Sequence, residues 1–451
     1  MYRVILGAAC AALLTQLPAT ARANPTKFQH IVIIVQENRT PDNLFHGLQK
    51  FLPQADIADS GVNSKGVTIP LKPISLMTHF DLGHLHPDFV RMYDGGKMDG
   101  ADLVSCGENQ GKCPANPAFH YVEPSDVVPY REIAIHYGFA NRMFQTNQGP
   151  SYPAHQFIFS GTSQINARSG VFVAENPDGT KVGCAAPPDE TVIAIRPGGA
   201  EDERVYPCFE HSTIADLLGT PPHDPTHPIG WRYYSDNTDD IWTAPNSIRH
   251  LCQPAGDPPE CSAPEWSNGD IVAWPAQILV DIDHKALRQV SWVIPTGQDS
   301  DHANINQGTG PSWVASIVNA IGKSAYWDNT VVLITWDDWG GWYDHVAPPK
   351  QNIFGYYEMG FRVPLLVVSP YTPAGYVSQK QHDFGSILRF IETVFDLGRI
   401  PPGNFADARA DDLMDFFDFA TPPRSFSAIP SKVPASHFLD RSRPMLPPDD
   451  D

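Results

Sequence analysis

Residues 330–345 read TVVLITWDDWGGWYDH, and this stretch decides the fold class. The apolar run at 330–335 is typical of a buried strand, and the paired glycines predict a turn just beyond it. Asp337 and Asp338 fall between strand and turn, at the carboxyl end of the strand. In open α/β sheets this end faces the crevice where ligands bind. The stretch therefore predicts an α/β sheet with acidic side chains at its ligand-binding edge.

A second apolar run, at 31–35, leads into polar residues in the same way. Glu37 and Asn38 follow it directly, so they also belong at the end of a predicted strand. Carboxylate and amide oxygens suit a hard or borderline divalent cation. For either pair alone, a solvated loop or a helix cap is the alternative. If the two strand ends meet, the expected ligands are Glu37, Asn38, Asp337 and Asp338.

Helical and strand patterns alternate in the second half of the chain. Strands are expected at 290–294 and 363–368, and helices from Pro311 and over about 383–396. This alternation predicts a mainly parallel sheet sandwiched between helices. Residues 46–290 are rich in Pro, Gly and Asp, so we expect long loop-rich insertions there.

The ends of the chain predict export. Residues 1–23 carry an arginine, an apolar segment and then small residues, which is typical of a secretory signal peptide; an uncleaved anchor is the alternative. No later stretch has the ~18 uninterrupted apolar residues of a membrane span. We expect a secreted or periplasmic protein without stable membrane insertion, with a main domain at 24–420 and a Pro-rich, acidic tail at 421–451.

The number and spacing of the cysteines are consistent with an exported protein. Six lie beyond the predicted signal peptide, in three close pairs within loop-like stretches. Six cysteines allow 15 pairings, but this spacing favours three local disulfides. A structural zinc site is disfavoured, because none of the pairs has C-x-x-C spacing. The expected pairs are Cys106–Cys113, Cys184–Cys208 and Cys252–Cys261.

The formal net charge of −20 at pH 7 limits the partners. Binding to nucleic acid or to an anionic lipid surface depends on basic patches, so no nucleic-acid partner is expected. A bound cation can invert the electrostatics of a single pocket, so an anionic substrate is still compatible with the negative net charge. The sequence indicates no oligomeric state.

Ser151 is the candidate nucleophile. It lies in GPSYP at 149–153, just before a helical pattern. Serine at a helix start commonly caps the helix, and this alternative stays open. The other hypothesis is nucleophilic, because a metal-bound hydroxyl loses its proton more readily and a helix N-terminus binds anions. Three loop histidines are either inert or meet in the same crevice: His84, His302 and His345.

Five segments together resemble the bacterial phosphoesterase family, which contains secreted phosphatidylcholine-type phospholipases C and acid phosphatases. They are QENRTPDNLF at 36–45, GKMDG at 96–100, GPSYP at 149–153, SDH at 300–302 and WDDWGGWYDHV at 336–346. The resemblance runs from about residue 29 to 397. It implies an alkaline-phosphatase-like fold and a metal-dependent hydrolase of phosphoric esters that uses a serine nucleophile.

The resemblance also implies roles for individual residues. One divalent cation, of unknown identity, is expected on Glu37, Asn38, Ser151, Asp337 and Asp338. The nucleophile is expected to be Ser151, and the residues lining the phosphate pocket or protonating the leaving group are expected to be His84, His302 and His345. Some members have Asp-His-Thr-Ser before the last helix, where this chain has DFGS at 383–386, so no catalytic role is carried there.

Three functions are compatible with these features. We expect acid-phosphatase-like activity first, because little chain follows residue 420 to form the additional domains of longer phospholipases. A phospholipase C acting on phospholipid head groups is the alternative, and an inactive exported binding protein is a further one. The aromatic segment at 231–234 could hold a choline group by cation–π contact, although its pattern favours a buried strand.

Overall fold

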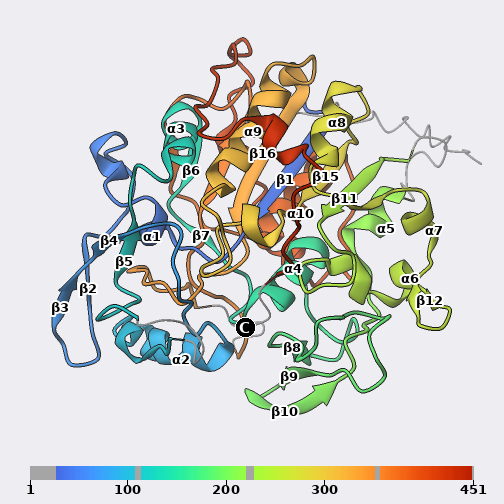
Figure 1. Ribbon diagram of the computed structural model, residues 1–451, viewed down its shortest axis with the longest axis horizontal. Coiled ribbons are helices and arrows are strands. Elements are labelled where there is room, and N and C mark those ends of the chain that lie inside the picture. The colour runs from blue at the N-terminus through green and yellow to red at the C-terminus, as the bar shows by residue number, and fades with distance from the viewer. Residues whose placement is uncertain (1–26, 107–112, 220–227, 351–355, 449–451) are drawn as a thin grey trace, which may run out of the picture.

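A computed structural model of the chain describes residues 27–106, 113–219, 228–350 and 356–448 (Figure 1). The predicted signal peptide lies outside these residues. Within the described ranges, no helix is both long enough and apolar enough to cross a membrane.

An eight-stranded sheet forms the centre of the molecule, in the order β14-β11-β15-β1-β16-β17-β6-β18. Its strands are β1 (His30–Gln36), β6 (Gly138–Ala140), β11 (Trp231–Ser235), β14 (Ile271–Ala273), β15 (Val290–Val293), β16 (Thr330–Trp336), β17 (Leu365–Val368) and β18 (Tyr376–Ser378). Every neighbouring pair is parallel except the two that involve β17, which runs antiparallel to β16 and β6. The mainly parallel sheet predicted from the sequence is confirmed.

The reversed direction of β17 was not predicted. A parallel neighbour needs a crossover connection, usually a helix. In the described part of the link between β16 and β17, residues 337–350 and 356–364, no helix is present. That link instead carries the acidic turn, so the chain returns antiparallel.

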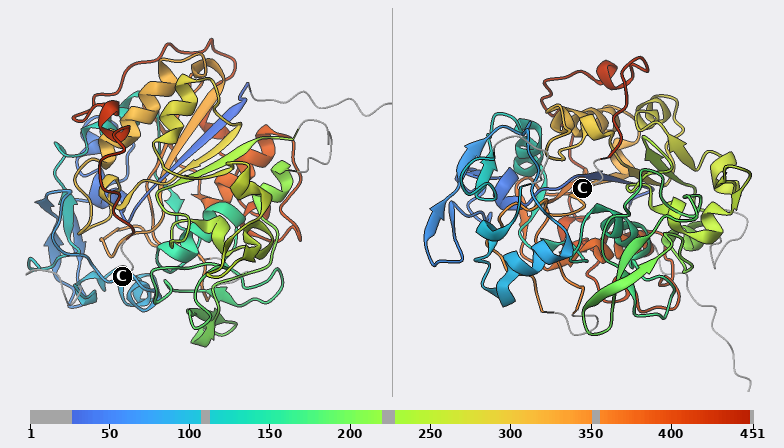
Figure 2. Two further views of the ribbon diagram at one scale, coloured as in Figure 1. Left: turned by 45° about the vertical axis from the view of Figure 1, so that its right-hand side comes forward. Right: turned by 60° about the horizontal axis from the view of Figure 1, so that its bottom comes forward.

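Helices cover both faces of the sheet, as the alternating pattern predicts. On one side lie α3 (Val128–His136), α8 (Gln277–Asp283) and α9 (Gly310–Gly322); on the other lie α4 (Ser151–Ser160) and α10 (Phe384–Val394) (Figure 2). Contacts join α9 to both α3 and α8, and join α10 to α4. The helices predicted from Pro311 and over 383–396 are α9 and α10.

Residues 46–290, predicted as loop-rich insertions, also contribute β6, β11 and β14 to the sheet and α3, α4 and α8 to its faces. The rest of this range, together with two short elements outside it, forms small elements around the sheet. The α-helices among them are α1 (Pro41–Leu44), α2 (His86–Tyr93), α5 (Ile214–Gly219), α6 (Arg249–Cys252) and α7 (Pro264–Ser267). The strands are β2 (Ser60–Val62), β3 (Thr68–Pro70), β4 (Lys72–Ile74), β5 (His120–Val122), β7 (Met143–Phe144), β8 (Phe172–Val173), β9 (Val192–Arg196), β10 (Ala200–Val205), β12 (Pro254–Ala255), β13 (Glu260–Cys261) and β19 (His382–Asp383). The aromatic segment at 231–234 belongs to the buried central strand β11, the interpretation that its pattern favoured.

The described part of the C-terminal tail is held against the domain. It contains α11 (Ala435–Phe438). Arg443 Nη2 lies 2.9 Å from Asp299 Oδ1, and Leu446 N donates to Gln298 Oε1 at 2.8 Å. The tail therefore packs along the loop that precedes His302.

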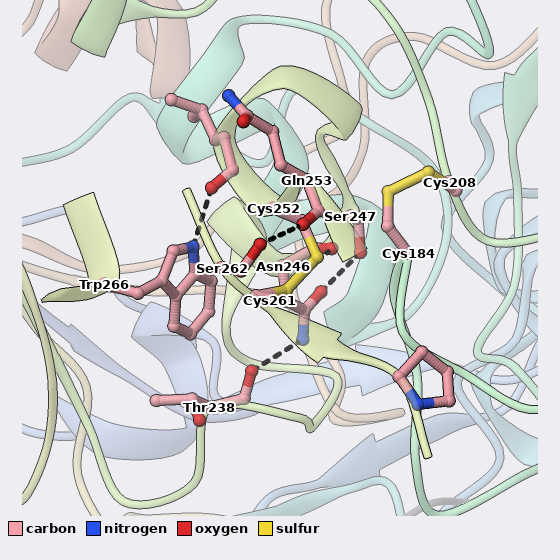
Figure 3. Close-up of a disulfide and its surroundings, with 12 residues drawn as sticks. Cys184, Cys208, Thr238, Asn246, Ser247, Cys252, Gln253, Cys261, Ser262 and Trp266 are labelled. Atoms are coloured by element: carbon pink, nitrogen blue, oxygen red, sulfur yellow. Dashed lines mark hydrogen bonds between the residues drawn. A yellow bond between two sulfur atoms is a disulfide. The ribbon is translucent and has the colours of Figure 1, made fainter. Parts of the chain in front are cut away.

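The six cysteines pair locally, as Cys106–Cys113, Cys184–Cys208 and Cys252–Cys261. The last two disulfides lie close to each other (Figure 3) and pack together in one small cluster. Around them, Trp266 Nε1 donates to Leu251 O at 2.6 Å and Ser262 Oγ donates to Gln253 O at 2.6 Å. The cross-links thus hold an insertion that has little regular structure of its own.

Peptide mapping of unreduced protein should recover these three linkages and no others. Replacing both Cys252 and Cys261 with serine should lower the free energy of unfolding by roughly 2–4 kcal/mol, because the loop they close gains freedom in the unfolded chain. Denaturant titration measures this loss. A peptide linking Cys106 to any cysteine from Cys184 onward would show that the pairing is wrong.

Candidate active site

The candidate site begins where β1 and β16 end side by side. The two strands pair in register, from His30 opposite Thr330 to Gln36 opposite Trp336. Beyond the pair, Asp337 N donates to Gln36 O at 3.0 Å. The two polar strand ends found in the sequence are therefore neighbours.

Asn38 and the paired glycines allow the two ends to approach closely. Asn38 N donates to Asp337 Oδ1 at 3.0 Å. Asn38 has φ 61°, a left-handed conformation that Asn adopts more readily than most residues. Gly340 and Gly341 are also left-handed, and a Cβ atom on Gly340 would lie 2.5 Å from Asn38 O. Glycine is therefore required where the turn crosses the end of β1.

Three carboxylates meet here, and the described part of the chain does not neutralise them. Glu37, Asp337 and Asp338 are all fully buried, and none pairs with a lysine or arginine of the described residues. Among the described residues, Glu37 Oε2, Asp337 Oδ2 and Asn38 Oδ1 find no hydrogen-bond partner. Burial, together with repulsion from neighbouring carboxylates, raises the pKa of Glu37 and of Asp338 well above their usual values. Such a cluster is costly unless a cation compensates it.

Ser151 places its hydroxyl in this cluster. It is the first residue of α4, and its Oγ donates to Asp338 Oδ2 at 3.1 Å. Pro150 occupies the N-cap position and makes no side-chain capping bond, and the first-turn N–H of Tyr152 donates to Asn176 Oδ1 at 3.0 Å. The hydroxyl therefore faces the acid instead of capping the helix.

His84 and His302 lie beside the cluster. Nδ1 of His84 donates to Leu82 O at 2.7 Å, and Nδ1 of His302 donates to Ala303 O at 2.8 Å. These contacts leave Nε2 as the proton-accepting nitrogen of each neutral ring. His84 Nε2 lies 3.1 Å from Asn38 Nδ2, and the two imidazole centroids are 6.0 Å apart. Two of the three predicted histidines therefore meet at the site.

His345 lies in a different cluster. Its Nδ1 is 2.8 Å from Asp42 Oδ2, and its Nε2 is 3.1 Å from Asp56 Oδ1. The buried Arg362 pairs with Asp42 and Asp344 in the same cluster. Burial alone would lower the pKa of His345, but the hydrogen bond and attraction of Asp42 outweigh it and raise the pKa. Across the described residues, no hydrogen bond or ion pair joins His345 to Ser151 or to the three carboxylates, so the structure does not bring it to the site.

His155 is a site residue that the sequence analysis missed. Its Nε2 lies 3.2 Å from Glu37 Oε1 and 3.9 Å from Asp337 Oδ2. Burial lowers the pKa of His155 to about 4, so the ring is neutral at pH 7. The signal was its position four residues after Ser151 in a helical pattern, since that spacing places two side chains on one helix face.

These donors fit a divalent cation. Glu37, His155 and Asp337 each offer an atom, and the three atoms lie within 4.8 Å of one another. Buried oxygens without hydrogen-bond partners and an unneutralised negative charge are what such an ion would satisfy. A second buried group of the same kind, beside the first, is Asp81, His84 and His302.

The segment before α10 has a structural role. Asp383 caps that helix, and its side chain accepts a hydrogen bond from Ser386 N at 3.2 Å. The neighbouring His382 contacts Ser378 Oγ at 2.9 Å and Asp411 Oδ1 at 3.2 Å.

Comparison with known proteins gives consistent results. The model of the Phosphoesterase family matches residues 28–398. Phospholipase C A of Mycobacterium tuberculosis (strain ATCC 25618 / H37Rv) is 28% identical over 467 residues, which cover 94% of this chain and 82% of that protein. Phospholipase C B of the same strain is 24% identical over 471 residues, with the same two coverages.

Two further matches are weaker, one in the share of the other protein that is covered and one in structural similarity. Non-hemolytic phospholipase C of Pseudomonas aeruginosa is 23% identical, over 90% of this chain and 59% of its own length. Among solved structures, a protein in the alkaline phosphatase superfamily from Vibrio parahaemolyticus matches 88% of this chain and 72% of its own. Its TM-score is 0.39 and its sequence identity is 10%.

Replacing Asp337 with Asn should remove cation binding without unfolding the protein. The substitution keeps the shape but neutralises one of three crowded carboxylates, so the chelator-treated variant should melt at or above the chelator-treated parent. Activity should fall by roughly 10²-fold or more, as for a lost charge at the reacting centre. Calorimetry with and without chelator, and metal analysis, measure these effects. Asp407→Asn, which changes a buried acid elsewhere, serves as the control and should keep its cation; near-normal cation content in Asp337→Asn would contradict the assignment.

Replacing His345 with Gln should affect stability in a pH-dependent way. The pKa of His345 is raised in the folded protein, so its ion pairs stabilise fully below the unfolded pKa of about 6.5, and this contribution is lost as the pH rises through the folded value. The difference in unfolding free energy between parent and variant should therefore be largest near pH 5–6 and shrink at alkaline pH. His284→Gln, at a site where the side chain is 70% exposed, is the control. A pH-independent difference would contradict the role of these ion pairs, and loss of turnover in fully folded His345→Gln would support a catalytic role for His345.

Proposed function

The chain belongs to the Phosphoesterase family and hydrolyses phosphoric esters, and we propose that it does so at the buried cluster around Ser151. The observation that carries this proposal is the contact between Ser151 Oγ and Asp338 beside carboxylates that no described lysine or arginine neutralises. A hydroxyl in this setting is a nucleophile for phosphorus once the local charge is compensated.

The proposal includes a cation because the site and the phosphoryl group of the substrate are both negatively charged. Glu37, Asp337 and Asp338 would repel a phosphoryl group. One divalent ion on these residues and Asn38 would offset that repulsion, lower the pKa of the Ser151 hydroxyl and draw charge from the phosphoryl oxygens. The oxygens of Glu37, Asp337 and Asn38 that lack partners support this placement.

The residues of the chain supply the remaining steps. Asp338 Oδ2 accepts the hydrogen bond of Ser151 and so orients its oxygen. As the Oγ–P bond forms and the bond from phosphorus to the leaving oxygen breaks, the Ser151 proton passes to Asp338 and a histidine donates a proton to the leaving oxygen. Water then attacks phosphorus and gives a proton to that histidine. The Oγ–P bond breaks, the phosphoryl product leaves, and the Ser151 oxygen regains its proton from Asp338.

His84 and Asn38 are placed to act on the phosphoryl group together. The Nε2 atom of His84 lies 3.1 Å from the Asn38 amide nitrogen, so a phosphoryl group beside this pair can receive a hydrogen bond from the amide and a proton from protonated His84. His302, with its Nδ1 fixed on a backbone carbonyl, is the second candidate for the acid. We propose that His345 stabilises the neighbouring loop through its contacts with Asp42 and Asp56.

Two substrate classes fit this chemistry. A phosphomonoester, as in acid phosphatases, is the first. Phospholipases C A and B of M. tuberculosis, however, align with this chain over 82% of their own length, and they support the head-group ester of a phospholipid. Assays on p-nitrophenyl phosphate and on p-nitrophenylphosphorylcholine, each with and without chelator, separate the two. Activity on neither substrate nor on other phosphodiesters would favour an exported binding protein.

Replacing Ser151 with Ala should nearly abolish turnover while the fold persists. The structure gives this serine no capping bond to lose, so the melting temperature should stay within a few degrees of the parent. Loss of the covalent step should lower the rate by roughly 10⁴-fold or more, as for other serine nucleophiles. Rapid quenching with a slow substrate should trap phosphate on the peptide containing Ser151.

A control tests whether any loss comes from the helix start alone. Ser160→Ala changes a buried serine at the other end of α4 and should leave turnover within a few fold of the parent. Normal turnover in Ser151→Ala, or phosphate trapped on another peptide, would place the nucleophile elsewhere.

A further inference from the structure

We propose that His155 is a direct ligand of the same cation as Glu37 and Asp337, and that the site therefore selects a borderline ion such as Zn²⁺ over Ca²⁺. The proposal rests on the cation site in the proposed function. It adds a fifth side chain to that site and names the class of ion that the site takes.

The spacing of the donor atoms suits a shared ion. Nitrogen and oxygen ligands lie about 2.0–2.2 Å from Zn²⁺, so two of them on one ion are roughly 3–4 Å apart. His155 Nε2 is 3.2 Å from Glu37 Oε1 and 3.9 Å from Asp337 Oδ2. Both separations fall in that range.

The surroundings of the ring orient Nε2 toward the carboxylates. The side chain of His155 is fully buried, and its Nδ1 atom has no hydrogen-bond partner in the described residues. Its ring lies nearly parallel to that of Trp242, with centroids 6.4 Å apart. The only polar contacts that fix the ring are therefore those of Nε2 with the acid cluster.

A simple hydrogen bond from His155 to Glu37 is the alternative, and it explains less. It would satisfy Glu37 Oε1 but leave Glu37 Oε2 and Asp337 Oδ2 buried without partners. An ion between these atoms satisfies the oxygens and the imidazole lone pair at once. Its positive charge also compensates the carboxylates, which a neutral imidazole does not.

An imidazole among oxygen ligands decides the kind of ion. Ca²⁺ is bound by six to eight oxygens, and Mg²⁺ by oxygens in an octahedral arrangement. Imidazole nitrogen favours Zn²⁺ and other transition-metal ions. The carboxylates alone would accept either class, so selectivity depends on His155.

Metal titration of chelator-treated protein tests the selectivity. The parent should bind Zn²⁺ more tightly than Ca²⁺. His155→Asn should weaken Zn²⁺ binding by about 10–100-fold, the loss typical of groups that support a metal site, and should change Ca²⁺ binding much less. The Zn²⁺-to-Ca²⁺ preference should therefore fall.

His211→Asn is the matched control. His211 is also a buried histidine, and its Nδ1 contacts Ser212 O at 3.1 Å while its ring packs against Phe405. It belongs to none of the candidate metal groups in the described residues. Its replacement should leave both affinities unchanged. If His155→Asn does not fold, His155→Gln provides a second variant of similar polarity.

A spectroscopic readout separates a ligand from a neighbour. Pulsed electron paramagnetic resonance of Cu²⁺-loaded protein is best done in a His84→Asn/His302→Asn background, which removes both imidazoles of the neighbouring candidate group. In that background, coupling to an imidazole nitrogen should be present with His155 and with added His211→Asn, and it should be absent in His155→Asn. Persistent coupling in His155→Asn, or an unchanged Zn²⁺-to-Ca²⁺ preference, would overturn the inference and leave the cation site intact. A parent protein that binds none of these ions would instead overturn the cation in the proposed function.

Discussion

The in-register pairing of β1 with β16 is the constraint on which the rest of the structure depends. Because Gln36 lies opposite Trp336, both strands stop at the same level and their polar ends share one edge of the sheet. A slip of one residue would turn every side chain of a strand to the other face. The buried apolar runs thus do more than fill the core: their register sets which oxygens meet.

The sequence predicted this part well because it follows from local pattern and sheet topology. Two apolar runs that each end in acids, in a parallel sheet, place those acids at one edge, and Glu37, Asn38, Asp337 and Asp338 do meet there. Ser151 needed the family resemblance as well, since local pattern alone favours a helix cap. The structure shows where Ser151 lies, with its hydroxyl donating a hydrogen bond to Asp338.

What sequence could not predict depends on contacts between distant segments. His345 follows an acid beyond a strand, as His302 does, yet Asp42 and Asp56 hold it in another cluster. His155 lies four residues after Ser151 in a helical pattern, which places both on one helix face, but its contacts with Glu37 and Asp337 depend on how α4 packs against the ends of β1 and β16. The antiparallel direction of β17 could not be predicted either. It depends on whether a helix connects β16 to β17, and no helix is present in the described part of that link.

Arg39 shows how the fold leaves the acid cluster without a basic partner among the described residues. It directly follows Asn38 and is fully buried, so its charge is the nearest along the chain to the carboxylates. Its guanidinium nonetheless donates to Asp301 O, at 2.9 and 2.7 Å, and lies 5.0 Å from the Trp342 ring. A fixed arginine among the carboxylates would stabilise the fold and occupy the place of a cation. Because Arg39 is held on the backbone of the neighbouring loop, the chain gives up that ion pair, and Glu37, Asp337 and Asp338 keep the uncompensated charge that the proposed cation would need.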